Sequence, residues 1–265
     1  MHRLSTLAAV LCLGLMPPAA RALPGVCVVD PTGMSGIPGA YASINDAFAL
    51  GGCNAAGSSV TVWCPLGGCS DTAVQVVGLT DITIESLEGA TAGPVTLVGG
   101  PGTPAVTITG STNIQFLGIS TYTAAPMAVS ISDSTATLAG PTALLVPRYT
   151  NVTGPTGVGV QGASVVTLKG IGITDSHTGL HLASNANGTP AVYATGVAFL
   201  RNALAAEVVG PATGCLTTPS AVLDIRGDGS LAWLNYVMEN IEGFRLTGRS
   251  LLAIDHTVLA SNLLQ

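Results

Sequence analysis

Charged side chains are scarce in this chain. Only 8% of its 265 residues are Asp, Glu, Lys or Arg, and Lys169 is the only lysine. Acidic residues outnumber basic ones by 14 to 8, which gives a formal net charge of −6. Nucleic acid and anionic membrane surfaces both need Lys or Arg to displace counterions, so we expect neither as a partner.

Aromatic residues and helical patterns are also few. Phe, Trp and Tyr make up 4% of the chain, and no long amphipathic helical period occurs beyond the N-terminus. Trp63 and Trp233 stand in apolar strand contexts, which predicts core packing rather than exposed platforms for sugars. Gly, Thr, Ser, Val and Ala dominate instead, a composition typical of extended chain with frequent turns.

The first 22 residues have the order of a secretory signal. The basic start His2-Arg3 is followed by an uncharged run over 4–16, by Pro17, and by the small-residue segment over 20–22. The apolar run is too short to span a bilayer, so we expect no transmembrane segment. The chain is therefore predicted to be secreted or extracytoplasmic, in a periplasm or on a cell surface.

Five cysteines follow the predicted signal: Cys27, Cys53, Cys64, Cys69 and Cys215. In an oxidising compartment the first four predict two disulfides near the N-terminal end, with a pairing that the spacing leaves open. Zinc is the alternative, but no histidine stands among them. Cys215 is a free thiol, an intermolecular link or a buried apolar residue.

A degenerate repeat emerges when short alternating runs are aligned by their apolar positions. Segments 164–182 and 190–208 superimpose with a constant offset of 26 residues, and a third copy begins at Ser250. Each unit reads as two short strands and a turn. The superimposed pairs are Leu168/Ala194, Ile171/Val197, Ile173/Phe199, Leu180/Ala206 and Leu182/Val208.

A closing run ends each unit, and alternation along these runs predicts which side chains point inward. Segments 140–156, 185–189 and 210–220 are rich in Gly, Pro and Thr and read as insertions. Asn202 and Asn262 fall at equivalent turn positions, with Ser176 in the same place one unit earlier. The asparagines bond backbone across units or are ordinary loop residues. The predicted inward residues are Val106, Ile108, Val129, Ile131, Val158, Val160, Leu180, Leu182, Phe244 and Leu246.

The segment Tyr41-Ala-Ser-Ile-Asn-Asp-Ala-Phe-Ala-Leu-Gly-Gly52 resembles the N-terminal capping helix of pectin-lyase-like proteins. The strand-like runs over 59–65, 74–76 and 81–85 are similar to the first coils of that family. The resemblance implies an all-β, right-handed parallel β-helix with a short N-terminal capping helix. It implies one domain over 23–265, with a cap over about 23–58 and coils over about 59–265.

Enzymes of that family cleave acidic polysaccharides with a basic residue and aspartate-bound calcium, or hydrolyse them with paired carboxylates. This chain has no run of adjacent aspartates, no Gly-His-Gly and no acidic cluster with the lyase spacing. We therefore predict no cofactor and no metal site, and calcium has no support from a motif.

One constellation follows from the alignment of the closing runs. Their middle, outward residues form a column of Thr107, Ser130, Gly159, His181, Glu207 and Arg245. The last three are the candidate catalytic residues: His181 as acid or base, Glu207 as its partner, and Arg245 as a carboxylate clamp. The alternative is that opposite charges simply stabilise an exposed sheet.

Smaller candidates carry less specific signals. Asp175, His177 and His181 are three possible metal ligands near one turn, and Asp224 to Asp228 is an acidic segment around an arginine. The pair Asp255-His256 is discounted as a dyad because neighbours on a strand point to opposite faces. Two segments, at Asn151 and Asn187, fit the glycosylation acceptor pattern.

These observations favour a secreted or cell-surface β-helix acting as a non-catalytic structural, adhesive or glycan-contacting module. The alternative is a small polysaccharide lyase or glycoside hydrolase with an atypical site on His181, Glu207 and Arg245. The chain stops at Gln265 without an amphipathic cap, so we expect either a fragment of a longer protein or self-association through an uncapped C-terminal coil.

Overall fold

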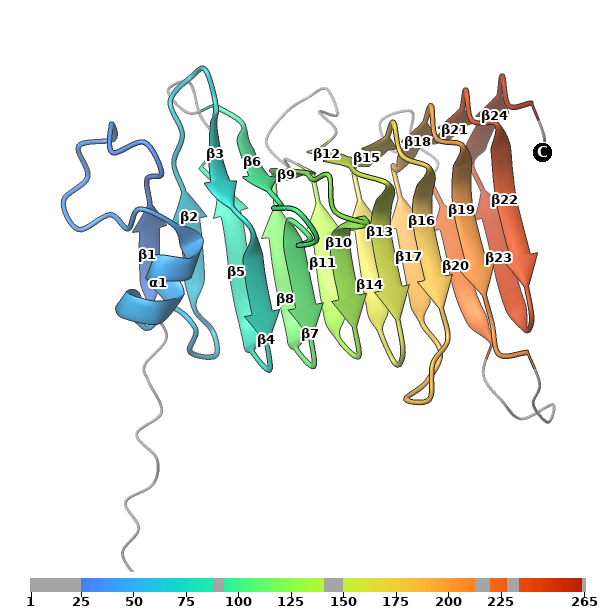
Figure 1. Cartoon of the computed structure of the whole chain (residues 1–265), viewed down its shortest axis with the longest axis horizontal. Coiled ribbons are helices and arrows are strands. Elements are labelled where there is room, and N and C mark those ends of the chain that lie inside the picture. The colour runs from blue at the N-terminus through green and yellow to red at the C-terminus, as the bar shows by residue number, and fades with distance from the viewer. Residues whose placement is uncertain (1–24, 88–92, 141–149, 213–219, 228–233, 264–265) are drawn as a thin grey trace, which may run out of the picture.

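The protein is a rod of stacked coils, seen in a computed structural model that describes residues 25–87, 93–140, 150–212, 220–227 and 234–263 (Figure 1). Successive coils place their strands side by side in three parallel sheets. This is a right-handed parallel β-helix, which confirms the predicted fold class. Within the described ranges, α1 (Ile44–Gly51) is the one helix.

The three sheets run the length of the rod. Sheet A contains β1 (Val26–Val29), β2 (Ser59–Val62), β5 (Thr80–Ser86), β8 (Thr112–Leu117), β11 (Thr135–Ala139), β14 (Val165–Lys169), β17 (Ala191–Thr195), β20 (Ala221–Arg226) and β23 (Ser250–Asp255). Sheet B contains β3 (Cys69–Thr72), β6 (Val95–Val98), β9 (Ile119–Tyr122), β12 (Thr150–Thr153), β15 (Ile171–Thr174), β18 (Ala198–Leu200), β21 (Asn235–Met238) and β24 (Thr257–Ala260). Sheet C contains β4 (Val74–Val77), β7 (Val106–Thr109), β10 (Met127–Ser132), β13 (Thr156–Gln161), β16 (Thr178–Ala183), β19 (Leu204–Val209) and β22 (Glu242–Thr247).

Each full unit therefore has three strands, one more than the sequence pattern suggested. In the unit over 164–182, Gly170 separates β14 from β15 and takes a left-handed conformation with a φ of 61°. Asp175 does the same between β15 and β16, with a φ of 56°. A single left-handed residue turns the chain sharply while both flanking strands stay extended. The sequence pattern therefore reads β14 and β15, which meet at Gly170, as one strand.

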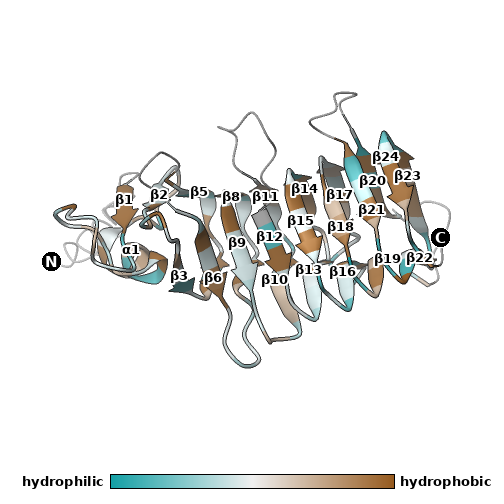
Figure 2. Cartoon of the chain, turned by 90° about the horizontal axis from the view of Figure 1, so that it is seen from above, coloured by the Kyte–Doolittle hydropathy of each residue, from teal (hydrophilic) through white to brown (hydrophobic). Residues whose placement is uncertain are grey.

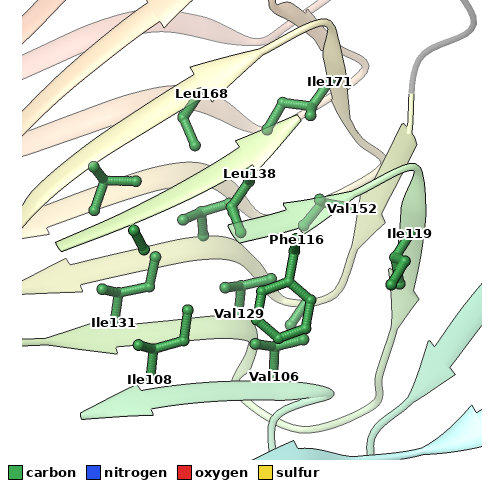
Figure 3. Packing of buried hydrophobic residues seen from close by; sticks show 14 of the residues in the cluster. Val106, Ile108, Phe116, Ile119, Val129, Ile131, Leu138, Val152, Leu168 and Ile171 are labelled. Atoms are coloured by element: carbon green, nitrogen blue, oxygen red, sulfur yellow. The ribbon is translucent and has the colours of Figure 1, made fainter. Parts of the chain in front are cut away.

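The core is a set of aliphatic columns along the axis. Val129 faces Val158, and Val158 faces Leu180, on successive strands of sheet C. All three side chains are at most 1% exposed. Figure 3 shows such neighbours, including Val106, Val129, Ile108 and Ile131, stacked from coil to coil. The predicted inward positions and the 26-residue offset are thus confirmed through Val208.

The core predictions for Leu246 and Trp63 are wrong in detail. Leu246 has the predicted inward register but is 42% exposed, because β22 is the last strand of sheet C and is paired on one side only. Phe244, on the same strand, is partly buried against the core. Trp63 is half-buried rather than fully in the core, and Trp233 lies outside the described residues.

The predicted insertion over 140–156 contains a regular strand. β12 (Thr150–Thr153) pairs with β9 on one side and β15 on the other, so it belongs to sheet B. Its Thr-Asn-Val-Thr sequence has one apolar residue, Val152, which is 3% exposed and completes a core column. One inward side chain is enough for a strand whose backbone is paired on both edges, and the apolar pattern is then too short to detect.

Asparagine side chains join the coils at the corner between sheets B and C. The Oδ1 atoms of Asn202 and Asn240 accept bonds from the backbone N–H groups of Ser176 and Asn202 at 3.0 and 2.9 Å. Asn262 repeats the arrangement with the N–H of Asn240 at 3.0 Å. This confirms that Asn202, Asn262 and Ser176 are equivalent, and it adds Asn240, which stands in a unit with an irregular spacing.

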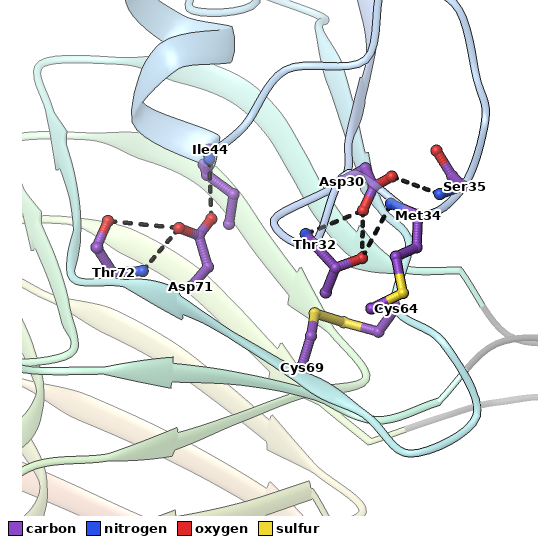
Figure 4. Close-up of a disulfide and its surroundings, with 9 residues drawn as sticks. All are labelled: Asp30, Thr32, Met34, Ser35, Ile44, Cys64, Cys69, Asp71 and Thr72. Atoms are coloured by element: carbon purple, nitrogen blue, oxygen red, sulfur yellow. Dashed lines mark hydrogen bonds between the residues drawn. A yellow bond between two sulfur atoms is a disulfide. The ribbon is translucent and has the colours of Figure 1, made fainter.

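The N-terminal cap covers the first coil. Ser43 caps α1 by accepting from the N–H of Asp46, and Gly52 ends it with a φ of 68°. Asp71 occupies an inward position of β3, in register with Leu97, and its Oδ2 accepts from the N–H of Ile44 at 2.9 Å (Figure 4). A carboxylate replaces an aliphatic residue here because a helix terminus, rather than another coil, lies against it.

Two disulfides hold the same region, as predicted. They join Cys27 to Cys53 and Cys64 to Cys69. Cys215 lies outside the described residues, as does the predicted signal over 1–22. β1 already belongs to sheet A, so the first disulfide ties the first strand of the rod to the end of the capping helix.

Asn202→Ala tests the asparagine corner. Asn202 is 1% exposed, and loss of its side chain removes the acceptor of the buried Ser176 N–H and one bond to the carbonyl of Ile173. Such a loss costs about 1–3 kcal/mol for each unsatisfied group. We expect the free energy of unfolding, measured by denaturant titration, to fall by at least that amount. Asn54→Ala, at an exposed loop residue, is the control and should change it by less than about 0.5 kcal/mol.

Acid titration tests the turn at Asp30. Burial raises the pKa of this carboxyl, but bonds from Ser35 and Thr32 outweigh it and lower the pKa from 3.8 to about 2. Because the folded pKa is depressed, the stabilisation is complete above pH 4 and is lost as the pH falls toward 2. We expect Asp30→Asn to be less stable at neutral pH and to lack this acid-dependent component. Equal acid dependence in both proteins would show that Asp30 is not its source.

Candidate functional site

The predicted outward column exists on sheet C. Thr107, Ser130, Gly159, His181, Glu207 and Arg245 are direct neighbours on successive strands from β7 to β22. Gln75 on β4 extends it by one residue toward the N-terminus. The column forms because each of its residues lies between two inward apolar residues of its strand, as Glu207 lies between Ala206 and Val208.

The three candidate catalytic residues contact one another. Nδ1 of His181 lies 3.0 Å from Oε2 of Glu207, and Nη1 of Arg245 lies 3.6 Å from Oε1 of the same carboxylate. The side chains of His181 and Glu207 are 27% and 23% exposed, and that of Arg245 is 50% exposed. The irregular spacing before Arg245 therefore does not displace it from the column.

Glu242 is a fourth member that the sequence did not predict. Its carboxylate accepts two bonds from Arg245, at 3.1 Å from Nε and 2.5 Å from Nη2. The bond and the charge of Glu242 raise the pKa of Arg245 above its usual value. Arg245 is thus held by two carboxylates and keeps its charge at any physiological pH.

A break in alternation explains why Glu242 was missed. The four strands of sheet C nearest to β22, from β10 to β19, bury both their second and third residues, as at Ala128 and Val129 of β10. After this double inward step the first and fourth residues of the strand face the same side. Glu242 and Arg245 are the first and fourth residues of β22, whereas strict alternation would place them on opposite faces.

The charged residues of the column are partly exposed on the outer face of sheet C. Gly159, next to His181, is covered by Met127: a Cβ at Gly159 would lie 2.4 Å from the Met127 sulfur. A groove of about 800 Å³ lies at the N-terminal end of the rod, and its lining includes none of the column residues. The side chains of the charged cluster pair with one another and are partly open to solvent.

The residues near Asp175 do not form a metal site. Asp175 makes two bonds of 2.8 Å to Arg201, which lower the pKa of its carboxyl, while His181 bonds Glu207. His177 is an exposed turn residue. Among the described residues, no group of three or more His, Cys, Asp or Glu side chains is placed to hold a metal ion.

Two other acidic segments form local ion pairs. Asp224 accepts from Arg226 at 2.6 Å, and Asp228 lies outside the described residues. The prediction that Asp255 and His256 point to opposite faces of a strand is wrong. The two side chains are 3.1 Å apart, because His256 is a left-handed corner residue with a φ of 48° and not part of a strand. Both side chains are about half exposed or more, in no groove.

No known protein family, no curated protein and no solved structure matches this chain. The resemblance to pectin-lyase-like proteins therefore stays a prediction from the residues that carry it. No helix in the described ranges is long and apolar enough to cross a membrane. The two disulfides fit an extracellular protein.

A double-mutant cycle on His181→Ala and Glu207→Ala tests the structural role of this pair. For a partly exposed cross-strand pair we expect a coupling free energy of about 0.2–1 kcal/mol at low salt. It should shrink in 0.5 M salt, where screening is stronger (the Debye length is about 10 Å at 0.1 M). A coupling above about 3 kcal/mol would identify a desolvated pair instead of a surface ladder.

Proposed function

We propose that this chain is an exported, non-catalytic β-helix module, a rigid scaffold that contacts glycans through its surface. The observation that carries the proposal is that His181, Glu207, Arg245 and Glu242 pair with one another on the partly exposed outer face of sheet C. These are the side chains that the sequence singled out for chemistry, together with the carboxylate that engages them.

Polysaccharide cleavage makes demands that this arrangement meets poorly. β-Elimination needs a basic group free to take a proton, and hydrolysis needs two carboxylates on either side of the sugar bond. Arg245 already binds Glu242 through two bonds, and Glu207 lies between His181 and Arg245. A substrate would have to break these pairs on an open surface, where water screens each new interaction.

Export and a glycan environment are supported by separate observations. The order of residues over 1–22 is typical of a secretory signal, and two disulfides stabilise the N-terminal end. The resemblance to pectin-lyase-like proteins implies a carbohydrate context. The rod itself, with fully buried aliphatic columns and bonded corners, suits a role in which shape and stability matter.

The rival function is an atypical lyase or glycoside hydrolase. One contact favours it: the bond between His181 and Glu207 has the geometry of a base oriented by a carboxylate. In that case Arg245 would bind a substrate carboxylate after release from Glu242.

An activity assay separates the two functions. We expect no unsaturated or reducing ends when the mature protein is incubated with uronic-acid polymers, with or without calcium. Glu242→Gln, which removes one of the two carboxylates that pair with Arg245, should also yield none. Release of such ends by the wild-type protein, abolished by Arg245→Ala in a folded variant, would establish the enzyme and overturn the proposal.

A further inference from the structure

A groove lined by both polar and apolar residues opens at the N-terminal end of the rod. It lies where the start of α1, the end of β3 and the turn after β6 meet, and its volume is about 800 Å³. Figure 4 shows one wall, where Asp71 of β3 meets the first turn of α1. The polar residues of the lining include Ser43, Asn45, Asp46, Ser70, Thr72 and Thr103.

The lining favours a neutral, hydroxyl-rich ligand. Among the described residues that line the groove there is no Lys, Arg or His, so nothing offsets the charge of an anionic ligand. Asp71 is 6% exposed and accepts from the N–H groups of Ile44 and Thr72, so its charge is already engaged. The hydroxyls and amides that remain both donate and accept hydrogen bonds, as sugar hydroxyls do.

The groove continues into a row of small polar side chains on the outer face of sheet B. Ser70, which lines the groove, is followed in register by Thr96, Ser120 and Asn151 on β6, β9 and β12. These strands lie side by side (Figure 2), so the spacing of the row is about 4.8 Å. The row ends at β15 and β18, where Gly172 and Ala198 occupy the same position.

An exposed aromatic ring stands beside this row. Tyr122 is 55% exposed and pairs with Val98, which is 39% exposed and lines the groove. Thr72 and Thr153 flank them in the same column of β3 and β12. An exposed tyrosine ring offers an apolar face to a sugar ring and a hydroxyl to its edge. The few aromatics of the sequence gave no sign of this platform.

We infer that the groove and the sheet B row, defined as Ser70, Thr96, Ser120 and Asn151 with Tyr122 beside them, form one track that binds a neutral polysaccharide chain. The inference rests on the proposed function and names its ligand class. Both ends of the track are fixed by the fold: the groove at the cap and the loss of polar side chains at β15. The sheet B row lies on a different sheet from His181 and Glu207, which belong to sheet C.

Binding assays with a matched pair of tyrosines test the track. The mature protein is titrated with soluble neutral glucans, mannans and galactans, and with polygalacturonate as the anionic comparison. We expect binding to at least one neutral polymer and none to polygalacturonate. Tyr122→Ala should weaken that binding about tenfold. Tyr193→Ala, at a ring 47% exposed on the outer face of sheet A, should leave it unchanged.

A double variant, Ser120→Ala with Thr96→Ala, tests the row independently because it removes two hydroxyls and no aromatic ring. It should also weaken binding. Thermal unfolding of each variant establishes that it is folded. Absence of binding to every neutral polymer, preference for polygalacturonate, or equal loss in Tyr122→Ala and Tyr193→Ala would overturn the track. These outcomes differ from failure of the proposed function, which would be cleavage of a polymer.

Discussion

The hydrogen bonds between successive coils are the interaction on which this structure depends. Beyond the first pair, β1 with β2, the described strands pair with strands one full coil away, as β10 does with β7 and β13. The backbone is therefore satisfied only when whole coils stack in register. That condition places like residues above one another, aliphatic side chains inside and polar columns outside. The asparagine corner and the capping helix extend the same bonding to the turns and to the first coil.

Much of this was predictable from the sequence because stacking imposes a repeat. The offset that aligned Leu168 with Ala194 and Ile173 with Phe199 is the true pairing of those residues. Prediction failed where the chain leaves regular strands. β12 has one inward apolar residue and gave too little pattern. Left-handed corner residues such as Gly170 and His256 changed the strand count and the direction of a side chain, which alternation alone does not describe.

The candidate site, like the fold, was predicted from the sequence only in part. His181, Glu207 and Arg245 were placed together by alternation and the repeat, and their contacts agree. Glu242 was not predicted, because two successive inward residues at the start of β22 place it on the same face as Arg245, which strict alternation does not describe. The groove at the cap was beyond reach for another reason: it is formed by α1, β3 and the turn after β6, which only the folded coil brings together. On sheet C the charged side chains of His181, Glu207, Arg245 and Glu242 pair with one another, whereas the outer face of sheet B carries small hydroxyl and amide side chains.

Residue-resolved amide hydrogen exchange of the native protein tests the stacking most directly. The strands β13, β16 and β19 are each paired on both sides. If bonds between coils hold the rod together, their amides exchange slowest and with similar protection. Protection should decline toward β22 and β23, which are paired on one side. Protection confined to α1 and the disulfide-bonded residues, with fast exchange through β13 to β19, would contradict the stacked coil.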